Sequence, residues 1–216
     1  EILVLDDAAS ALDYSTDSRL RKALNRHYSD TTTVIIAQRI SSVKDADHIR
    51  NVAGIIAETY LKGNDVIVVL SAQGDTTDDL IAKAEEINPN ASKREMDMLL
   101  TTGEQISASL LAMTIEDMGY AAVSLTGWQA GIQTNSRYSD GRIKKINTER
   151  INAELDKKRI VIVTGFQGIN KYDDITTLGR GGSDTSAVAL AVALITVCCL
   201  VFVKPEQLKI RQAPAK

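Results

Sequence analysis

Solid apolar runs alternate with amphipathic segments along most of the chain. The runs that predict buried strands cover residues 2–5, 33–37, 66–70, 121–125 and 160–164. Apolar residues at helical spacing predict helices at residues 18–28, 50–60, 77–87, two stretches within 92–115, 148–157 and from Thr185 onwards. Strands that alternate with helices form a mostly parallel sheet covered on both faces, so the pattern predicts an α/β fold.

The first 49 residues stand apart in this pattern. They contain one strand, one amphipathic segment and a second strand, which predicts a single βαβ crossover, and the pattern then restarts with a new helix at Arg50. A single crossover cannot bury both of its faces, so it requires further strands beside it. No linker-like composition separates the two parts. We therefore interpret the chain as two unrelated segments joined near Ile49.

A glycine-rich turn, residues 176–184, leads into the last helix. Gly179, Gly181 and Gly182 would let backbone amides approach an anion at the helix N-terminus, which favours negative charge. Arg180 could add a guanidinium clamp and Ser183 a hydroxyl. The simpler alternative is that Ser183 or Asp184 only caps the helix. A second glycine loop, residues 165–168, follows the strand at 160–164.

The segment 187–203 contains no charged residue. It falls just short of the roughly 20 apolar residues that a membrane-spanning helix needs. We favour a buried alanine-rich helix that runs into a buried strand over a membrane segment. Residues 195–216 form an apolar and then basic tail.

Composition and charge exclude several function classes. The 216 residues are 44% hydrophobic and 25% charged with a net charge of −3, as in globular proteins, and no basic cluster predicts nucleic-acid binding. Cys198 and Cys199 are adjacent, a spacing that disfavours an unstrained disulfide. With no signal-peptide pattern at the start, we expect a cytoplasmic protein. His27 and His48 have no paired ligand nearby in sequence, so no metal site is predicted.

The first segment resembles the last part of an ABC transporter ATPase domain. The strand that ends in Asp6 and Asp7 is similar to the Walker B strand, and the strand that leads to Gln38 is similar to the switch strand. Asp7 stands where that family has Glu, and Gln38 stands where it has His, so the resemblance implies a degenerate ATP site. The chain contains no GxxxxGK[ST] loop, so we expect no nucleotide to bind there. The alternative is a strand-end turn with solvated carboxylates.

The larger segment, residues 50–194, resembles the catalytic domain of the aspartokinases. The resemblance rests on strings at residues 66–80, 92–105, 124–131, 165–168 and 176–184, all in the family's order. It implies the amino acid kinase fold, a three-layer α/β/α sandwich. It also implies transfer of the γ-phosphoryl group of ATP to the β-carboxylate of L-aspartate, in lysine, threonine and methionine biosynthesis, with Mg²⁺ as a cofactor and a homo-oligomeric assembly.

The same resemblance assigns site residues. It puts Ser71 and Thr77 at the aspartate site and Glu104 at the substrate amine. It gives Arg180 and Ser183 the substrate carboxylate, and Asp184 an organising role near the catalytic lysine. Two of these positions have a simpler interpretation, because Thr101 with Glu104, like Ser92 with Glu95, also has the spacing of a helix capping box.

The chain departs from the aspartokinase pattern at both ends. The family begins with a strand and a Lys-Phe-Gly-Gly-Thr-Ser loop, whose lysine neutralises the transferred phosphoryl group, and here the first segment takes that place. The family's nucleotide-binding strand is replaced by the tail at 195–216. We therefore expect little kinase activity and doubtful ATP and Mg²⁺ binding. The alternatives are a transporter ATPase fragment and a non-functional fusion of the two.

Overall fold

Five parallel strands form the central sheet. The computed structural model describes residues 2–6, 32–37 and 46–202, with side chains described for residues 49–194. The strands lie in the order β1-β2-β3-β7-β4. Their bounds are β1 Ile2–Asp6, β2 Thr32–Ala37, β3 Val66–Leu70, β7 Ile160–Thr164 and β4 Ala122–Leu125. The predicted strands at residues 66–70 and 160–164 are confirmed residue for residue.

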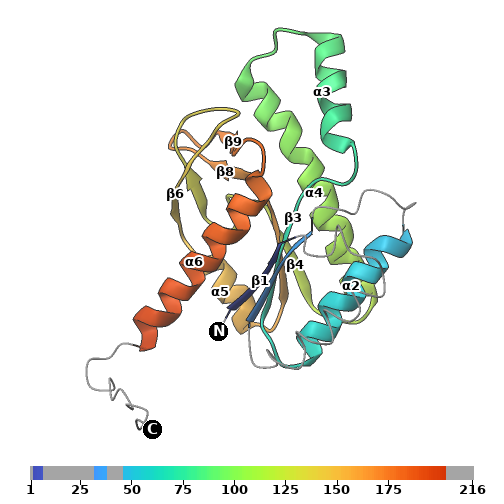
Figure 1. The fold of residues 1–216 in the computed structure, drawn as a ribbon, viewed down its shortest axis with the longest axis vertical. Coiled ribbons are helices and arrows are strands. Elements are labelled where there is room, and N and C mark those ends of the chain that lie inside the picture. Colours follow the sequence, from blue (N-terminus) through green and yellow to red (C-terminus); the bar gives the residue numbers. More distant parts are fainter. Residues whose placement is uncertain (1, 7–31, 38–45, 203–216) are drawn as a thin grey trace, which may run out of the picture.

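Helices cover both faces of this sheet (Figure 1). Helices α2 (Ala46–Leu61) and α4 (Lys93–Asp117) lie on one face, while α5 (Glu149–Asp156) and α6 (Gly182–Phe202) lie on the other. Side chains alternate between the faces, since Ile67 faces α6 whereas Val68 faces α4. Helix α3 (Thr76–Ile87) buries no residue of its own and packs beside α4. The predicted three-layer α/β/α sandwich is confirmed.

A second, smaller sheet was not predicted. It contains β6 (Ile143–Ile146), β5 (Ile132–Thr134), β8 (Gln167–Ile169) and β9 (Ile175–Thr177), in that order. Two predicted turns are therefore partly wrong: β8 includes the end of the glycine loop at 165–168, and β9 includes the start of the glycine-rich turn at 176–184. Antiparallel pairing of β8 with β9 satisfies their backbone groups.

The segment that we predicted as two helical stretches is one continuous helix, α4. Within it, the threonine hydroxyls at the Thr101-Thr102-Gly103 string donate to helix carbonyls, Thr101 to Met98 and Thr102 to Leu99. Gly103 lies at a close approach, because a Cβ there would be 2.9 Å from the Cβ of Ala72. The glycine thus permits contact between α4 and the loop after β3, without ending the helix.

The predicted strand after the alanine-rich helix is also wrong, since α6 continues to Phe202. The β-branched residues Ile195, Thr196 and Val197 favour a strand only weakly, and extending an existing helix needs no new nucleus. Among the described residues, no helix combines the length and apolar character needed to cross a lipid bilayer.

The first segment joins the central sheet through its two strands. β1 pairs with β2 in parallel, and β2 pairs with β3, so the larger segment provides the additional sheet that the predicted crossover requires. Helix α2 runs through the predicted junction at Ile49 without interruption. Asp6 ends β1, whereas Asp7 and Gln38 lie outside the described residues.

Two glycine substitutions test the fold, one expected to destabilise it and the other expected to stabilise it. Gly131 has a φ of 82°, and a Cβ there would collide with the carbonyl oxygen of Asn147. We expect Gly131→Ala to lower the free energy of unfolding by about 3 kcal/mol. Gly54, inside α2, has open space around its Cβ position, so Gly54→Ala should raise it by about 0.5–1 kcal/mol. Urea unfolding of both variants checks this pair, and a destabilised Gly54→Ala variant would contradict the continuous α2.

Candidate functional site

The loops after β3 and β7 meet at the carboxyl end of the central sheet. Leu70 and Thr164 are register partners at the ends of these strands, and the backbone N–H of Gly165 donates to the carbonyl oxygen of Leu70 at 2.8 Å. Ser71 follows β3 directly and is half-buried. Ligands of parallel α/β sheets bind at this edge, where the loops after neighbouring strands converge.

Glu104 projects from α4 into this region and is only 2% exposed. Its Oε1 accepts a hydrogen bond from the backbone N–H of Ala72 at 3.1 Å, whereas its Oε2 is buried with no hydrogen-bond partner in the described structure. Burial raises the pKa of Glu104 to about 7, and the Ala72 bond opposes this only in part. A buried carboxylate with one unpaired oxygen is suited to a cationic donor.

The start of α3 lies beside Glu104. A Cβ at Gly103 would be 3.4 Å from the Cγ2 of Thr76, the first residue of α3. Thr77 follows it and is half-buried. The structure therefore brings Ser71, Thr77 and Glu104 together near the loop that follows β3.

The glycine-rich loop reaches the same edge from the opposite face. Gly179 and Gly181 have φ values of 77° and 70°, and the N–H of Gly182 donates to the carbonyl oxygen of Gly179 at 3.0 Å. Ser183 is buried against Gly165, where an added Cβ would lie 2.7 Å from the Ser183 Oγ. The loop therefore packs directly on the end of β7.

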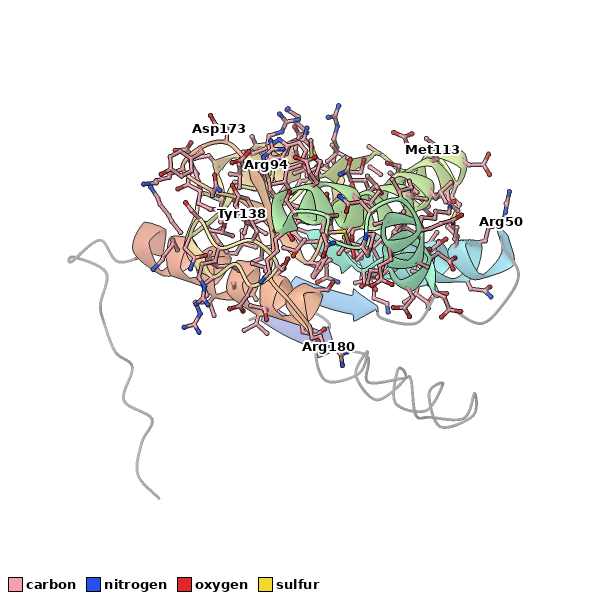
Figure 2. The ribbon with its side chains drawn as sticks, turned by 90° about the horizontal axis from the view of Figure 1, so that it is seen from above. Arg50, Arg94, Met113, Tyr138, Asp173 and Arg180 are labelled. Carbon is pink, nitrogen blue, oxygen red and sulfur yellow. The ribbon has the colours of Figure 1, made fainter. Side chains whose placement is uncertain are left out.

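This loop has the features of an anion site. Left-handed glycines at a helix N-terminus direct backbone N–H groups outward, and the first N–H groups of a helix have no partner within the helix. Arg180 is exposed on the loop, and Figure 2 shows its side chain extending away from the sheet. A carboxylate or phosphoryl group could therefore contact Ser183, the N-terminus of α6 and the Arg180 guanidinium.

The structure also decides between the capping alternatives. Glu104 lies in the middle of α4, so Thr101 and Glu104 form no capping box. Ser92 does cap α4, because its hydroxyl accepts from the backbone N–H of Glu95. Helix α6 begins at Gly182, which places Ser183 and Asp184 inside its first turn and not at the N-cap. Neither residue occupies the N-cap position itself, and Asp184 complements the helix dipole in the first turn.

Sequence reasoning missed three buried polar residues near this edge. The hydroxyl of Thr164 and the Oε1 of Gln167 are buried without a partner in the described structure, and the Nε2 of Gln167 donates to the Thr101 carbonyl oxygen at 3.2 Å. Asp97, on α4, is completely buried. The only available signal for Thr164 was its place in the strand alternation, on the side that faces α4.

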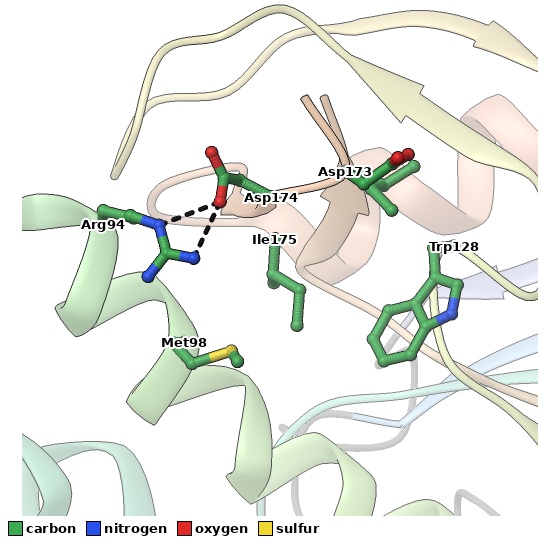
Figure 3. A pocket seen from close by; sticks show the side chains of 7 residues that line it. Arg94, Met98, Trp128, Asp173, Asp174 and Ile175 are labelled. Carbon is green, nitrogen blue, oxygen red and sulfur yellow. Dashed lines mark hydrogen bonds and ion pairs between the residues drawn. The ribbon is translucent and has the colours of Figure 1, made fainter. Parts of the chain in front are cut away.

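A separate hollow of about 300 Å³ lies near the N-terminal end of α4 (Figure 3). Met98, Trp128 and Ile175 give it an apolar lining, and Arg94 binds Asp174 at its rim. Hydrogen bonds from Tyr138 and Arg94 hold the pKa of Asp174 below its ordinary value. The hollow shares no residue with the predicted site.

The three-layer sandwich carries a buried acid and a glycine-rich loop at the carboxyl end of its central sheet, and this fold defines the class of α/β protein to which the chain belongs. The chain belongs to the amino acid kinase family, whose sequence profile matches residues 40–204. It is 54% identical over 170 residues to an aspartokinase of Geobacillus stearothermophilus, a match that covers 78% of this chain and 42% of the relative. The predicted resemblance to aspartokinases is confirmed, and the chain spans less than half of this relative's length.

Solved structures agree with this assignment. Aspartate kinase from Synechocystis superposes with a TM-score of 0.64 at 41% identity, over 75% of this chain and 26% of that one. E. coli aspartokinase III, solved with aspartate and ADP, superposes with a TM-score of 0.65 at 24% identity, over 75% of this chain and 47% of that one, and shows the shared fold. The transporter resemblance of the first segment stays a prediction.

Proposed function

We propose that this chain binds L-aspartate at the carboxyl end of its central sheet, as the substrate half of an aspartate kinase. The enzyme class transfers the γ-phosphoryl group of ATP to the β-carboxylate of aspartate. The unpaired Oε2 of the buried Glu104 carries the proposal most directly. The identity to curated aspartokinases supports it.

Glu104 would hold the ammonium group of the substrate. An ammonium is a compact cation with N–H donors, and a carboxylate oxygen without a partner in a buried site is its natural acceptor. Ser71 and Thr77 would add hydroxyls on the same side. Binding would also lower the pKa of Glu104, because a nearby positive charge favours the ionised carboxyl.

The opposite end of the substrate would lie at the glycine loop. Arg180 and Ser183 would bind the substrate carboxylate, which leaves the loop amides at Gly179 and Gly181 for the transferred phosphoryl group, since the Gly182 N–H already donates to the Gly179 carbonyl oxygen. Asp184, in the first turn of α6, stays the predicted organising residue. When bound, ATP and Mg²⁺ would supply the phosphoryl group and neutralise charge during its transfer.

Turnover by this chain would be low. The family begins with a strand and the lysine loop, and here the segment that contains β1 and β2 takes that place. Phosphoryl transfer depends on positioning and charge neutralisation, so loss of the main cation would cost orders of magnitude in rate. We therefore propose an aspartate-binding protein with impaired kinase activity. Cytoplasmic localisation and homo-oligomeric assembly belong to the same proposal.

Calorimetry with the full chain tests the binding. We expect L-aspartate to bind, whereas succinate, which lacks the ammonium group, should bind at least about tenfold more weakly because Glu104 is left unpaired. A coupled assay of aspartate-dependent ADP release should show little turnover. Equal affinity for the two ligands would contradict the role of Glu104, and turnover at ordinary enzyme rates would contradict the impaired activity.

A further inference from the structure

Asp97, a buried acid on α4, holds the base of the glycine-rich turn at residues 176–184 through several hydrogen bonds. Its carboxylate accepts from the backbone N–H of Ser139, at 3.0 Å to Oδ1 and 2.9 Å to Oδ2, and from the Ser139 hydroxyl at 3.3 Å. It also accepts from the backbone N–H of Thr177 at 3.0 Å and from the Thr177 hydroxyl at 2.8 Å. Asp97 is completely buried, so these donors replace its hydration.

The two donor residues belong to segments that border the anion site. Thr177 ends β9 and directly precedes the loop that carries Arg180 and Ser183. Ser139 has a φ of 63°, and the neighbouring Gly141 donates its N–H to the Thr177 carbonyl oxygen at 2.7 Å. The carboxylate of Asp97 thus fixes both the base of the glycine loop and the turn packed against it.

Asp97 and Glu104 project from the same face of one helix. They are two turns apart on α4, about 10 Å along its axis, and both are buried. Glu104 faces the end of β3, whereas Asp97 holds the residue before the glycine loop. A continuous helix is stiff, so α4 sets the separation between the proposed ammonium and carboxylate ends of the site.

We propose that Asp97 is a positioning residue that fixes the Arg180 loop relative to Glu104, and so maintains the affinity of the proposed site for L-aspartate. This inference rests on the proposed function. Asp97 touches no substrate and acts only through Thr177 and Ser139. Its charge matters because four N–H and O–H donors converge on it, and an amide side chain would turn its own NH₂ toward some of them.

A double-mutant cycle on aspartate affinity tests this role in the full chain. We expect Asp97→Asn to weaken L-aspartate binding by about tenfold, the effect of one lost charged hydrogen bond. The effects of Asp97→Asn and Arg180→Ala should be non-additive because they act through one loop, whereas Asp97→Asn and Glu104→Gln should add. Full additivity of Asp97→Asn with Arg180→Ala would overturn the proposal.

Glu154→Gln is the matched control. Glu154 is also a buried carboxylate, on α5, but it binds Arg150, Lys157 and Arg159 and none of the site residues. Its substitution should alter stability without changing aspartate affinity. If Asp97→Asn fails to fold, Thr177→Val removes a single hydroxyl donor and should weaken binding in the same direction, by a smaller factor. Unchanged affinity in Thr177→Val would then count against the role.

Hydrogen exchange separates this inference from the proposed function. Asp97→Asn should speed exchange of the Ser139 and Thr177 amides, and Glu154→Gln should not, whether or not the chain binds aspartate. If the wild-type chain binds no aspartate, the proposed function fails while faster exchange still supports the anchoring of the loop. Unchanged exchange at both amides overturns the anchoring itself.

Discussion

Replacing Glu104 with Gln is expected to weaken aspartate binding by about a hundredfold while raising the stability of the fold above pH 7. The substitution keeps the shape of the side chain, and the amide oxygen can still accept from the Ala72 N–H. It removes the negative charge that the substrate ammonium requires. Loss of a buried ion pair partner of this kind reduces affinity by about a hundredfold or more.

The pH dependence gives the sharper readout. Burial raises the pKa of Glu104 from 4.5 to about 7, so at pH 6 most molecules hold this carboxyl protonated and unable to accept a cation. Apparent affinity falls with the ionised fraction, so wild-type binding should be about tenfold tighter at pH 8 than at pH 6. Calorimetry at the two pH values measures this. An equally strong pH dependence in Glu104→Gln would assign the titration to another group.

Protonation of Glu104 has opposite effects on ligand binding and on folding: low pH weakens aspartate binding but stabilises the native state. Because the pKa of Glu104 is higher in the folded state than its ordinary value, the native state retains a proton that the unfolded chain releases. The stabilisation is complete below the ordinary pKa of 4.5 and is lost as pH rises through about 7. Glu104→Gln has no such loss, so its melting temperature relative to wild type should increase between pH 5 and pH 8. A relative decrease over that range would show that Glu104 is not desolvated.

Arg180→Ala is the second substitution with a large expected effect, about a hundredfold weaker aspartate binding. A guanidinium holds a carboxylate by two parallel hydrogen bonds, and alanine leaves only Ser183 and the helix N-terminus for that end of the ligand. Arg180→Lys should recover part of the loss, since the charge remains without the fork. Titration calorimetry at constant salt compares the three proteins.

Arg50→Ala is the control for charge. Arg50 is an exposed arginine on α2 that forms a surface ion pair with Asp117 at 3.4 Å, and Figure 2 shows it far from Arg180. Both alanine variants should unfold within about 0.5 kcal/mol of wild type, because exposed arginines contribute little to stability. If Arg50→Ala weakens binding as much as Arg180→Ala, general electrostatic attraction explains the effect and the clamp is wrong.

The central sheet was predictable because its inner strands are buried on both faces. Such strands consist of unbroken apolar runs, and β3 and β7 begin and end where those runs do. The short strands of the second sheet have no such signal. β5, β8 and β9 have three residues each, and they are held by non-local contacts such as that between the Thr134 and Thr176 hydroxyls.

The site was only partly predictable, for a similar reason. Family strings indicated Glu104, whereas the local pattern around it equally suggested a capping box. Asp97 stands in a charged string, which predicts the exposed first turn of a helix. Its burial depends on hydrogen-bond donors that lie 42 and 80 residues away in the chain. A single sequence contains no local signal for such a partner, so the positioning of the loop emerged only from the structure.

Helix α2 runs unbroken through Ile49, the predicted junction, and β2 pairs with β3 beside it. The hydrogen bonds between β2 and β3 are made by main-chain groups, which every residue except proline provides in the same way. These backbone hydrogen bonds therefore require a strand of suitable length and extended conformation, whatever its side chains. A phosphoryl-binding lysine has no such generic substitute. If the chain does join two unrelated segments, as its sequence predicts, the join would preserve the sheet architecture while it removes the lysine on which phosphoryl transfer depends.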